Sequence, residues 1–332
     1  KSPQDSGLRR ELYSVMHRLA EATRDAGDVD QSLQIADELV QGNRQRVAED
    51  PADREAPISL SGALYTLGKG RLIAGPLQDA LRAFEESRAL RAASLKVNPN
   101  RNTERWLADS IWRVAETLRR MGRYPQAEAV AREGVELNER RLVASPEVVT
   151  VAASLVNCKC ELALALAGQD RIEEALATIA DPLAVGASST GPSSRPATQP
   201  ADDAEFRSQL LETRGQILVR AGRFAEAREV LEPLIASGAI EPTTAPTTRT
   251  AAWPTAATAR VLLVRALAGE RNPGAIEVME PLIGEAVSYL DGNPNHPPAI
   301  ELLMLARRAE YEALSAAGRP DAAARAAAEA VE

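Results

Sequence analysis

The sequence predicts an all-α protein, built as a solenoid of about seven antiparallel helix-turn-helix units. The first observation is a recurring phrase in which a turn glycine precedes an apolar residue and then a small residue. The small residues recur at intervals of 48, 47, 48, 52, 48 and 48, and they are Ser32, Ala80, Ala127, Ala175, Ala227, Ala275 and Ala323. The second is an apolar pattern at helical spacing before each phrase, such as Ile111, Val114, Ala115 and Leu118. The third is length, because 332 residues exceed what one compact core usually fills, whereas an array grows unit by unit.

In chain order, each unit is expected to contain a first helix, a tight turn and a second helix. The glycine ends the first helix because it adopts the left-handed conformation readily. The small residue lets the two helices approach closely, and a proline such as Pro51, Pro99 or Pro146 ends the second helix. The result is a single domain over 8–332, with units at about 8–56, 57–102, 103–147, 148–203, 204–248, 249–296 and 297–332.

The second half of the chain departs from this plan in two ways. Pro182, Pro233 and Pro281 fall inside the second helices of units four to six, where proline kinks or shortens a helix. Stretches rich in Ser, Thr, Pro and Gly at about 186–203 and 237–253 bury too little apolar surface to fold, so they are predicted to be flexible insertions. They are interpreted as spacer loops, with a phosphorylated or partner-binding loop as the alternative.

Composition excludes several classes of protein. A net charge of −8 and a pI near 5.2 argue against a nucleic-acid partner, which needs a basic face. No apolar run approaches the 18 or so residues of a transmembrane helix, so no membrane insertion is expected in this chain. Cys158 and Cys160 point to different faces of a helix and cannot bridge each other, so both are expected to be buried thiols. This slightly favours the cytoplasm and leaves an extracytoplasmic location open.

No catalytic motif is present in the sequence. There is no nucleophile elbow and no phosphate-binding loop, since Gly68-Lys69-Gly70 is too short to cradle a phosphate. Only His17 and His296 are histidines, and His17 has one carboxylate, Glu21, a turn away, which favours surface pairing over metal binding. We therefore predict that the chain is not an enzyme and that it needs no cofactor or metal.

The motifs of the units follow one order along the chain. Leu67-Gly68, Gly122 with Tyr124, Ala127 and Pro146 show it, and so do Gly215, Gly222, Phe224 and Ala227. This order resembles the tetratricopeptide repeat family, whose standard unit has about 34 residues. The longer unit here is similar to the long-unit arrays of bacterial signalling proteins, including those attached to Ser/Thr protein kinases. The resemblance implies a right-handed α-solenoid of helix-turn-helix units.

The resemblance also implies a concave face, lined by the first helices, that binds a peptide or a helix of another protein. Candidate contacts are taken from their distance to the small residue of each unit. They are His17, Glu21, Arg24, Tyr65, Lys69, Asp109, Trp112, Glu116, Arg119, Asn157, Gln209, Glu212, Gln216 and Arg260. The Lys/Asn/Arg clamp with which some members hold a terminal carboxylate does not transfer, because lysine occurs only at positions 1, 69, 96 and 159.

Trp112 is the most informative of these candidates. It lies one position beyond the apolar stripe of its helix, where an aromatic ring can anchor a ligand. Packing against the next unit is the alternative for Trp112 and for Tyr65. Trp106 is expected to be a packing residue, and Trp253 is expected to fix the second insertion to the array.

The sequence thus predicts a non-enzymatic interaction scaffold for another protein or peptide. The alternative is a regulatory or sensor segment of a larger bacterial signalling enzyme such as a Ser/Thr protein kinase, because the chain begins at Lys1 rather than Met. The final helix exposes mainly Ala, Arg and Glu, which favours a monomer over a dimer.

Overall fold

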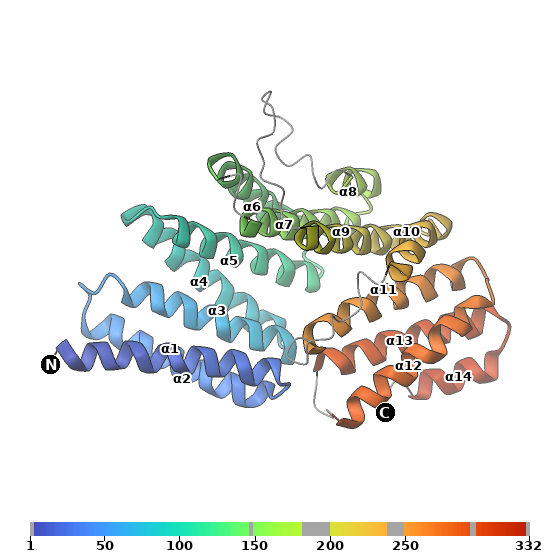
Figure 1. The fold of residues 1–332 in the computed structure, drawn as a ribbon, viewed down its shortest axis with the longest axis horizontal. Helices are drawn as coiled ribbons and strands as arrows, with labels where there is room; N and C mark the ends of the chain where they lie inside the picture. Colours follow the sequence, from blue (N-terminus) through green and yellow to red (C-terminus); the bar gives the residue numbers. More distant parts are fainter. Residues whose placement is uncertain (1–2, 146–148, 181–199, 238–248, 293–296, 330–332) are drawn as a thin grey trace. The chain divides into compact units, whose positions relative to one another are not determined.

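The computed structural model describes residues 3–145, 149–180, 200–237, 249–292 and 297–329 (Figure 1). Within these ranges it contains fourteen α-helices and no strand, which confirms the predicted all-α class. The chain forms two compact units, Lys1–Asn138 and Glu139–Glu332. Each unit is described by itself below.

The first unit is made of antiparallel helix pairs. Its helices are α1 (Pro3–Asp25), α2 (Val29–Glu49), α3 (Ala56–Ala74), α4 (Leu77–Val97), α5 (Arg101–Arg120) and most of α6 (Tyr124–Ala144). Each helix from α1 to α4 packs on the next one, and α1 also packs directly on α3. The first helices α1, α3 and α5 follow one another in Figure 1, with α2 and α4 behind them.

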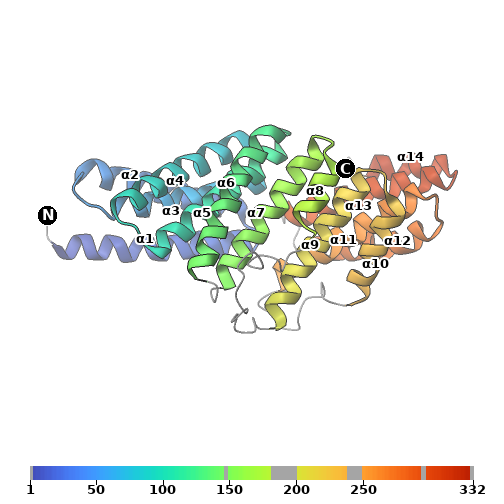
Figure 2. The ribbon, with the colours of Figure 1, turned by 90° about the horizontal axis from the view of Figure 1, so that it is seen from above.

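The second unit repeats this arrangement. Its further helices are α7 (Val149–Gly168), α8 (Ile172–Thr178), α9 (Pro200–Arg220), α10 (Phe224–Ala236), α11 (Arg249–Gly269), α12 (Gly274–Gly292), α13 (Pro297–Ala316) and α14 (Pro320–Glu329). The first helices pack in sequence, α7 on α9, α9 on α11 and α11 on α13, and each packs on its own second helix. Figure 2 shows the same helices from above. The predicted helix-turn-helix repeat is confirmed.

The recurring small residues lie where paired helices cross. All seven are buried, with Ala80, Ala127, Ala175 and Ala227 fully inaccessible. A glycine twelve residues before the small residue brings the helices closer still. A Cβ added at Gly68 would lie 2.6 Å from the Phe84 ring, and one added at Gly215 would lie 2.6 Å from the Leu231 side chain. Two elements of the sequence pattern thus fix the distance between the helices of a pair.

The turn glycine adopts the conformation that the sequence predicts. Gly122 and Gly222 have φ of 73° and 70°, in the left-handed region that ends a helix. Asp170 occupies the corresponding turn before α8 with φ of 61°, and Arg271 does so before α12 with φ of 56°. The fourth and sixth turns therefore keep the geometry without the glycine.

Proline and the insertions alter the second helices of the second unit. Helix α10 contains Pro233 and has 13 residues, and α12 contains Pro281 and has 19, whereas α2, α4 and α6 have 21 each. Pro182 and most of both predicted insertions lie outside the described residues. The described ends of those insertions are helical, since α9 begins at Pro200 and α11 at Arg249. The side chain of Trp253 also lies outside the description.

Helix α7 is the most apolar part of the fold. Its segment Thr150–Gly168 is long and apolar enough to cross a membrane by length and composition, which the sequence analysis did not anticipate. In the structure 67% of that segment is buried, as in a helix of a protein core. Cys158 and Cys160 are buried on this helix and do not form a disulfide, as predicted.

Candidate functional site

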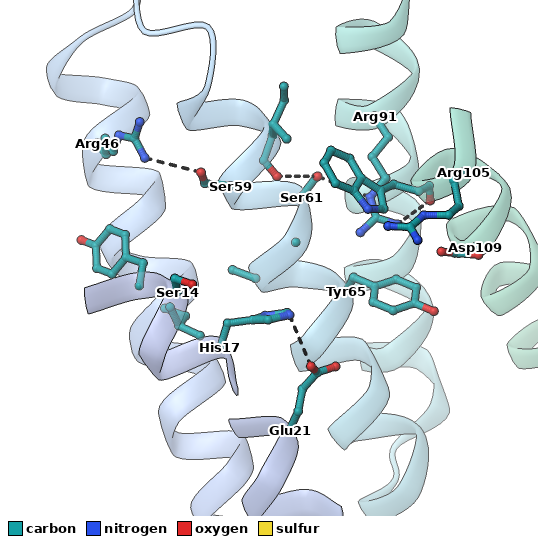
Figure 3. A pocket seen from close by; sticks show the side chains of 16 residues that line it. Ser14, His17, Glu21, Arg46, Ser59, Ser61, Tyr65, Arg91, Arg105 and Asp109 are labelled. Atoms are coloured by element: carbon teal, nitrogen blue, oxygen red, sulfur yellow. Dashed lines mark hydrogen bonds and ion pairs between the residues drawn. The ribbon is translucent and has the colours of Figure 1, made fainter. Parts of the chain in front are cut away.

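A cavity of about 660 Å³ opens in the first unit among α1, α3 and α5 (Figure 3). Helix α1 contributes Tyr13, Ser14, His17 and Glu21, and α5 contributes Arg105, Trp106 and Asp109. Arg46 of α2 and Arg91 of α4 reach the cavity from the second helices. Its wall therefore combines aromatic, hydroxyl and charged side chains from five helices.

Small residues on α3 leave this space open. Ser59, Ser61, Gly62 and Ala63 face the cavity where larger side chains would fill it. A Cβ added at Gly62 would meet no atom within 4 Å. The opening is thus a property of the α3 sequence and not of a gap between distant helices.

The α1 side of the cavity is a polar chain that joins α1 to α3. The Nδ1 atom of His17 is hydrogen-bonded to Thr66 Oγ1 at 2.9 Å, and its Nε2 lies 3.6 Å from Glu21 Oε2. Lys69 Nζ donates to the other oxygen of Glu21 at 2.5 Å. Burial lowers the pKa of His17, with Lys69 and Arg24 acting in the same direction against Glu21. His17 therefore lines the cavity as a neutral ring at neutral pH.

Glu21 and Lys69 show opposite balances of burial and pairing. Burial raises the pKa of Glu21, but the hydrogen bond and charge of Lys69 outweigh it and hold that pKa below its usual value. Burial also lowers the pKa of Lys69, although Glu21 opposes the shift. The two groups form an ion pair that joins α1 to α3 beside the cavity.

Arg91 is the most buried charged group of the cavity. Only 5% of it is exposed, and its guanidinium lies 4.7 Å from the centre of the Tyr65 ring. The Tyr65 ring in turn packs edge-on against Phe84, with 5.6 Å between ring centres. Arg91 Nη1 donates to the Trp106 carbonyl at 2.5 Å and to Ser110 Oγ at 2.8 Å. Burial lowers the pKa of Arg91 to about 10, so the group keeps its charge at neutral pH.

Helix α5 carries a second cluster beside the cavity, in contact with Tyr65 of α3. The Arg113 guanidinium stacks on the Trp112 ring at 3.9 Å and donates to Glu116 at 2.6 Å. Burial lowers the pKa of Arg113, but Glu116 and Tyr65 outweigh burial and raise it above its usual value. Trp112 is thus stacked on its own helix neighbour, and the tryptophan in the cavity wall is Trp106.

Four of the fourteen predicted contacts line the cavity: His17, Glu21, Tyr65 and Asp109. Lys69 is paired with Glu21 of this set, and Trp112 and Glu116 both contact Arg113. Arg24 is paired with Asp25 at 2.6 Å, and Arg119 lies in the last turn of α5.

The predicted contacts of the second unit are dispersed. Asn157 and Gln209 are hydrogen-bonded to each other at 2.8 Å, between α7 and α9. Arg260 is paired with Glu285 of α12 at 2.8 Å, and Gln216 is exposed. Burial raises the pKa of the Glu212 carboxyl to about 7.

Four further residues of the cavity wall are not predicted by the repeat pattern: Arg46, Arg91, Arg105 and Trp106. Arg46 and Arg91 lie on second helices, which the repeat pattern assigns to the outer layer. The run of small residues around Gly62 was the available signal, because small residues on a first helix leave room beside it.

The described residues contain no group of three or more His, Cys, Asp or Glu that could hold a metal ion. The cavity instead offers aromatic surface, hydroxyl groups and guanidinium groups. Groups of these kinds can stack on aromatic rings and make charged hydrogen bonds.

Comparisons with known proteins concern the fold. No family model and no curated protein matches the chain. Among solved structures, a Rap protein in complex with Competence and Sporulation Factor matches with 13% identity and a TM-score of 0.52, covering 97% of each chain. The TPR-like repeats of a putative kinesin light chain from Podosopora anserina match with 19% identity and a TM-score of 0.48, covering 68% of this chain and 94% of that one.

The match to the Rap protein over 97% of each chain agrees with the helix pairs described above. The chain has a tetratricopeptide-like repeat fold, all-α throughout the residues that the structure describes. The comparisons indicate no catalytic family.

Proposed function

We propose that this tetratricopeptide-like chain is a non-enzymatic scaffold that binds an extended peptide segment of a partner protein along the first helices of the unit Lys1–Asn138. The observation that carries the proposal is the cavity among α1, α3 and α5, with its volume of about 660 Å³. This size lies within the range of sites that enclose a few side chains of a ligand.

The chemistry of the wall supports a peptide rather than an apolar ligand. Tyr13, Tyr65 and Trp106 offer ring surface, while Ser14, Ser59 and Ser61 offer hydroxyl groups that can donate to and accept from a peptide backbone. The Rap protein that shares this fold over its whole length was solved with Competence and Sporulation Factor bound. We expect an affinity near micromolar, about −8 kcal/mol, because the wall is mixed in charge and open to solvent.

The test is to fill the cavity and measure peptide capture. Random linear peptides are selected on the immobilised chain, and the best binders are titrated by fluorescence anisotropy. Gly62→Leu places a side chain into the open space beside α3, and we expect it to weaken binding at least tenfold. Gly284→Leu is the matched control, because a Cβ at Gly284 also meets no atom within 4 Å but lies on α12 of the second unit.

Both variants should retain the helical circular dichroism signal of the parent chain. Equal binding by Gly62→Leu and the parent chain would show that the cavity is not the binding site. Trp112→Ala extends the measurement to the α5 flank: a loss there places part of the peptide on the Trp112–Arg113 stack.

A further inference from the structure

We propose that Arg91 and Arg105 form a subsite for an acidic side chain, aspartate or glutamate, of the bound peptide. This inference rests on the proposed peptide binding and adds the chemistry that selects the peptide. It is carried by the hydrogen bonds and the charges of the cavity wall.

Arg91 is a buried cation that makes no ion pair with the described residues. Its hydrogen bonds go to the Trp106 carbonyl and to the hydroxyl groups of Ser61 and Ser110, all of them neutral acceptors. Among the described residues, no carboxylate oxygen lies within 4.0 Å of its nitrogens. A buried guanidinium in this state has lost its hydration, and the charge of Asp109 acts on it without a direct ion pair. An incoming carboxylate can make that direct contact.

The guanidinium of Arg91 is also held ready for a ligand. The Tyr65 ring fixes one face of its plane, and Nη1 is fixed by Trp106 and Ser110. The other terminal nitrogen, Nη2, makes no hydrogen bond to the described residues and is not fully enclosed by protein atoms. It is the donor that remains for a ligand in the cavity.

Arg105 adds a second positive charge at the same wall. Figure 3 shows Arg91, Arg105 and Asp109 gathered at the α5 end of the cavity. The charge of Arg105 acts against the charge of Arg91, while Asp109 and the Tyr65 hydroxyl favour it. An anion bound at this wall would offset the repulsion between the two guanidinium groups.

The remaining charges of the cavity are matched within the protein. Arg46 is paired with Asp53 at 2.6 Å, and Glu21 is paired with Lys69. Arg91 and Arg105 remain at the α5 end, together with Asp109, whose charge acts on Arg91. A carboxylate brings one negative charge to these two cations, whereas a doubly charged phosphate would bring two beside Asp109.

The experiment measures whether selected peptides need an acidic side chain and whether these arginines read it. Peptides selected on the parent chain are synthesised as C-terminal amides, so that only side chains carry carboxylates. Each acidic position is replaced by its amide, Glu by Gln or Asp by Asn. Every pair is titrated against the parent chain, Arg91→Gln, Arg105→Gln and the control Arg54→Gln, which removes an exposed arginine outside the cavity.

We expect the amide replacement to weaken binding to the parent chain by about 10- to 100-fold, the usual worth of a charged hydrogen bond in a desolvated site. The ratio of the dissociation constants of the amide and acidic peptides should fall toward one in Arg91→Gln and Arg105→Gln. It should keep its parent value in Arg54→Gln. Arg105 is exposed, so its variant answers the question even where Arg91→Gln loses the helical signal.

The other outcomes separate the two proposals. Peptides that bind in a Gly62→Leu-sensitive way without any acidic requirement overturn the subsite and leave the peptide-binding function standing. The same holds when the acidic requirement survives in both arginine variants, or when binding needs a free C-terminal carboxylate. A selection that yields no cavity-dependent peptide overturns both.

Discussion

The two compact units build the same helical hairpin but treat one position of its second helix differently. Eleven residues after the small residue, the first unit has buried polar side chains: Asn43 on α2, Arg91 on α4 and Asn138 on α6. In the second unit the equivalent position on α12 is Ala286, which is fully buried, and α8 and α10 end before reaching it. Among the described residues, this position is occupied only where the second helix is long enough to include it.

The two asparagines show how a side chain at this position behaves away from the cavity. Asn43 donates to the Leu39 carbonyl and Asn138 to the Gly134 carbonyl, each one turn back in its own helix and each at 2.9 Å. Arg91 instead reaches past its own helix to Tyr65 and Trp106. The first unit thus has a buried polar residue at this position three times. Only at position 91 is the side chain long and cationic enough to reach the cavity.

The contacts between successive first helices also involve charged side chains in the first unit and neutral ones in the second. Helices α1 and α3 are joined by the charged pair Glu21–Lys69, whereas α7 and α9 are joined by the neutral pair Asn157–Gln209. The charged pair lies beside the cavity, and the neutral pair joins helices with no part in it. The repeated backbone arrangement accepts different side chains at these joints. One unit can therefore carry a cavity that the other does not share.

The largest expected effect comes from breaking an equivalent contact that occurs within each unit, between a glycine of a first helix and a large side chain of its second helix. Phe84→Ala and Leu231→Ala each remove a fully buried side chain that packs on a glycine of the paired helix. We expect each to cost about 3–5 kcal/mol of the free energy of unfolding. Hydrogen exchange should show the lost protection mainly in the unit that carries the change, because contacts in repeat arrays are local.

The same pair of variants tests the link to the cavity. Phe84 supports the Tyr65 ring, so Phe84→Ala should also abolish peptide capture under conditions where the chain is still helical. Leu231→Ala should leave capture unchanged. Equal loss of capture in both variants would contradict the assignment of the site to the first unit.

The second prediction concerns two carboxyl groups on first helices whose pKa values shift in opposite directions. Burial raises the pKa of Glu212 to about 7, from an ordinary value of 4.5, whereas that of Glu21 is lowered. As pH rises above 4.5, the unfolded chain ionises at Glu212 before the folded chain does, and stability falls until the folded group has ionised as well. The penalty at pH 8 is about 3 kcal/mol, from about 1.4 kcal/mol for each unit of pKa shift.

Glu212→Gln removes this ionisation. Denaturant unfolding should show the variant to be more stable than the parent at pH 8, with the difference disappearing near pH 4.5. A constant difference across this range would mean that the carboxyl is solvated in the folded state.

Much of the fold could be predicted from the sequence because its determinants are local. The small residues, the turn glycines and the helical apolar stripes each act within one hairpin, and Ala80, Gly122 and Ile111 are where the pattern requires them. The turn at Asp170 shows the limit, because the geometry persists there although the glycine is absent.

The site could be predicted only in part for a related reason. His17, Tyr65 and Asp109 follow from the register of the first helices, and they do line the cavity. Arg91 does not follow from that register, because its reach depends on the long α4 and on the gap that Ser61 and Gly62 leave in α3. Such a feature arises from three helices at once, and periodicity within one helix contains no sign of it.

The smallest expected effect is on the pairs that join successive first helices. Glu21 and Lys69 are partly exposed, with 34% and 17% of their side chains accessible, so solvent screening limits the worth of the pair. Burial disfavours the charged form of Lys69, whereas the pairing favours the charged form of Glu21. The net coupling energy of the pair should be about 0.5–1 kcal/mol. A double-mutant cycle with Glu21→Gln and Lys69→Met measures it by denaturant unfolding. Because the folded pKa of Glu21 is lowered, the coupling should be present at neutral pH and lost as pH falls through that pKa.

The neutral pair of the second unit is the matched comparison. A cycle with Asn157→Ala and Gln209→Ala should give a coupling of similar size, since one hydrogen bond contributes about 1 kcal/mol. Salt separates the two, because added ions screen the charged pair and leave the amide pair unaffected. Raising the salt concentration to about 1 M, where the screening length is about 3 Å, should reduce the Glu21–Lys69 coupling and leave the Asn157–Gln209 coupling intact. Equal salt dependence in both units would mean that the joints between first helices are alike in kind, and that the charged pair has no special place beside the cavity.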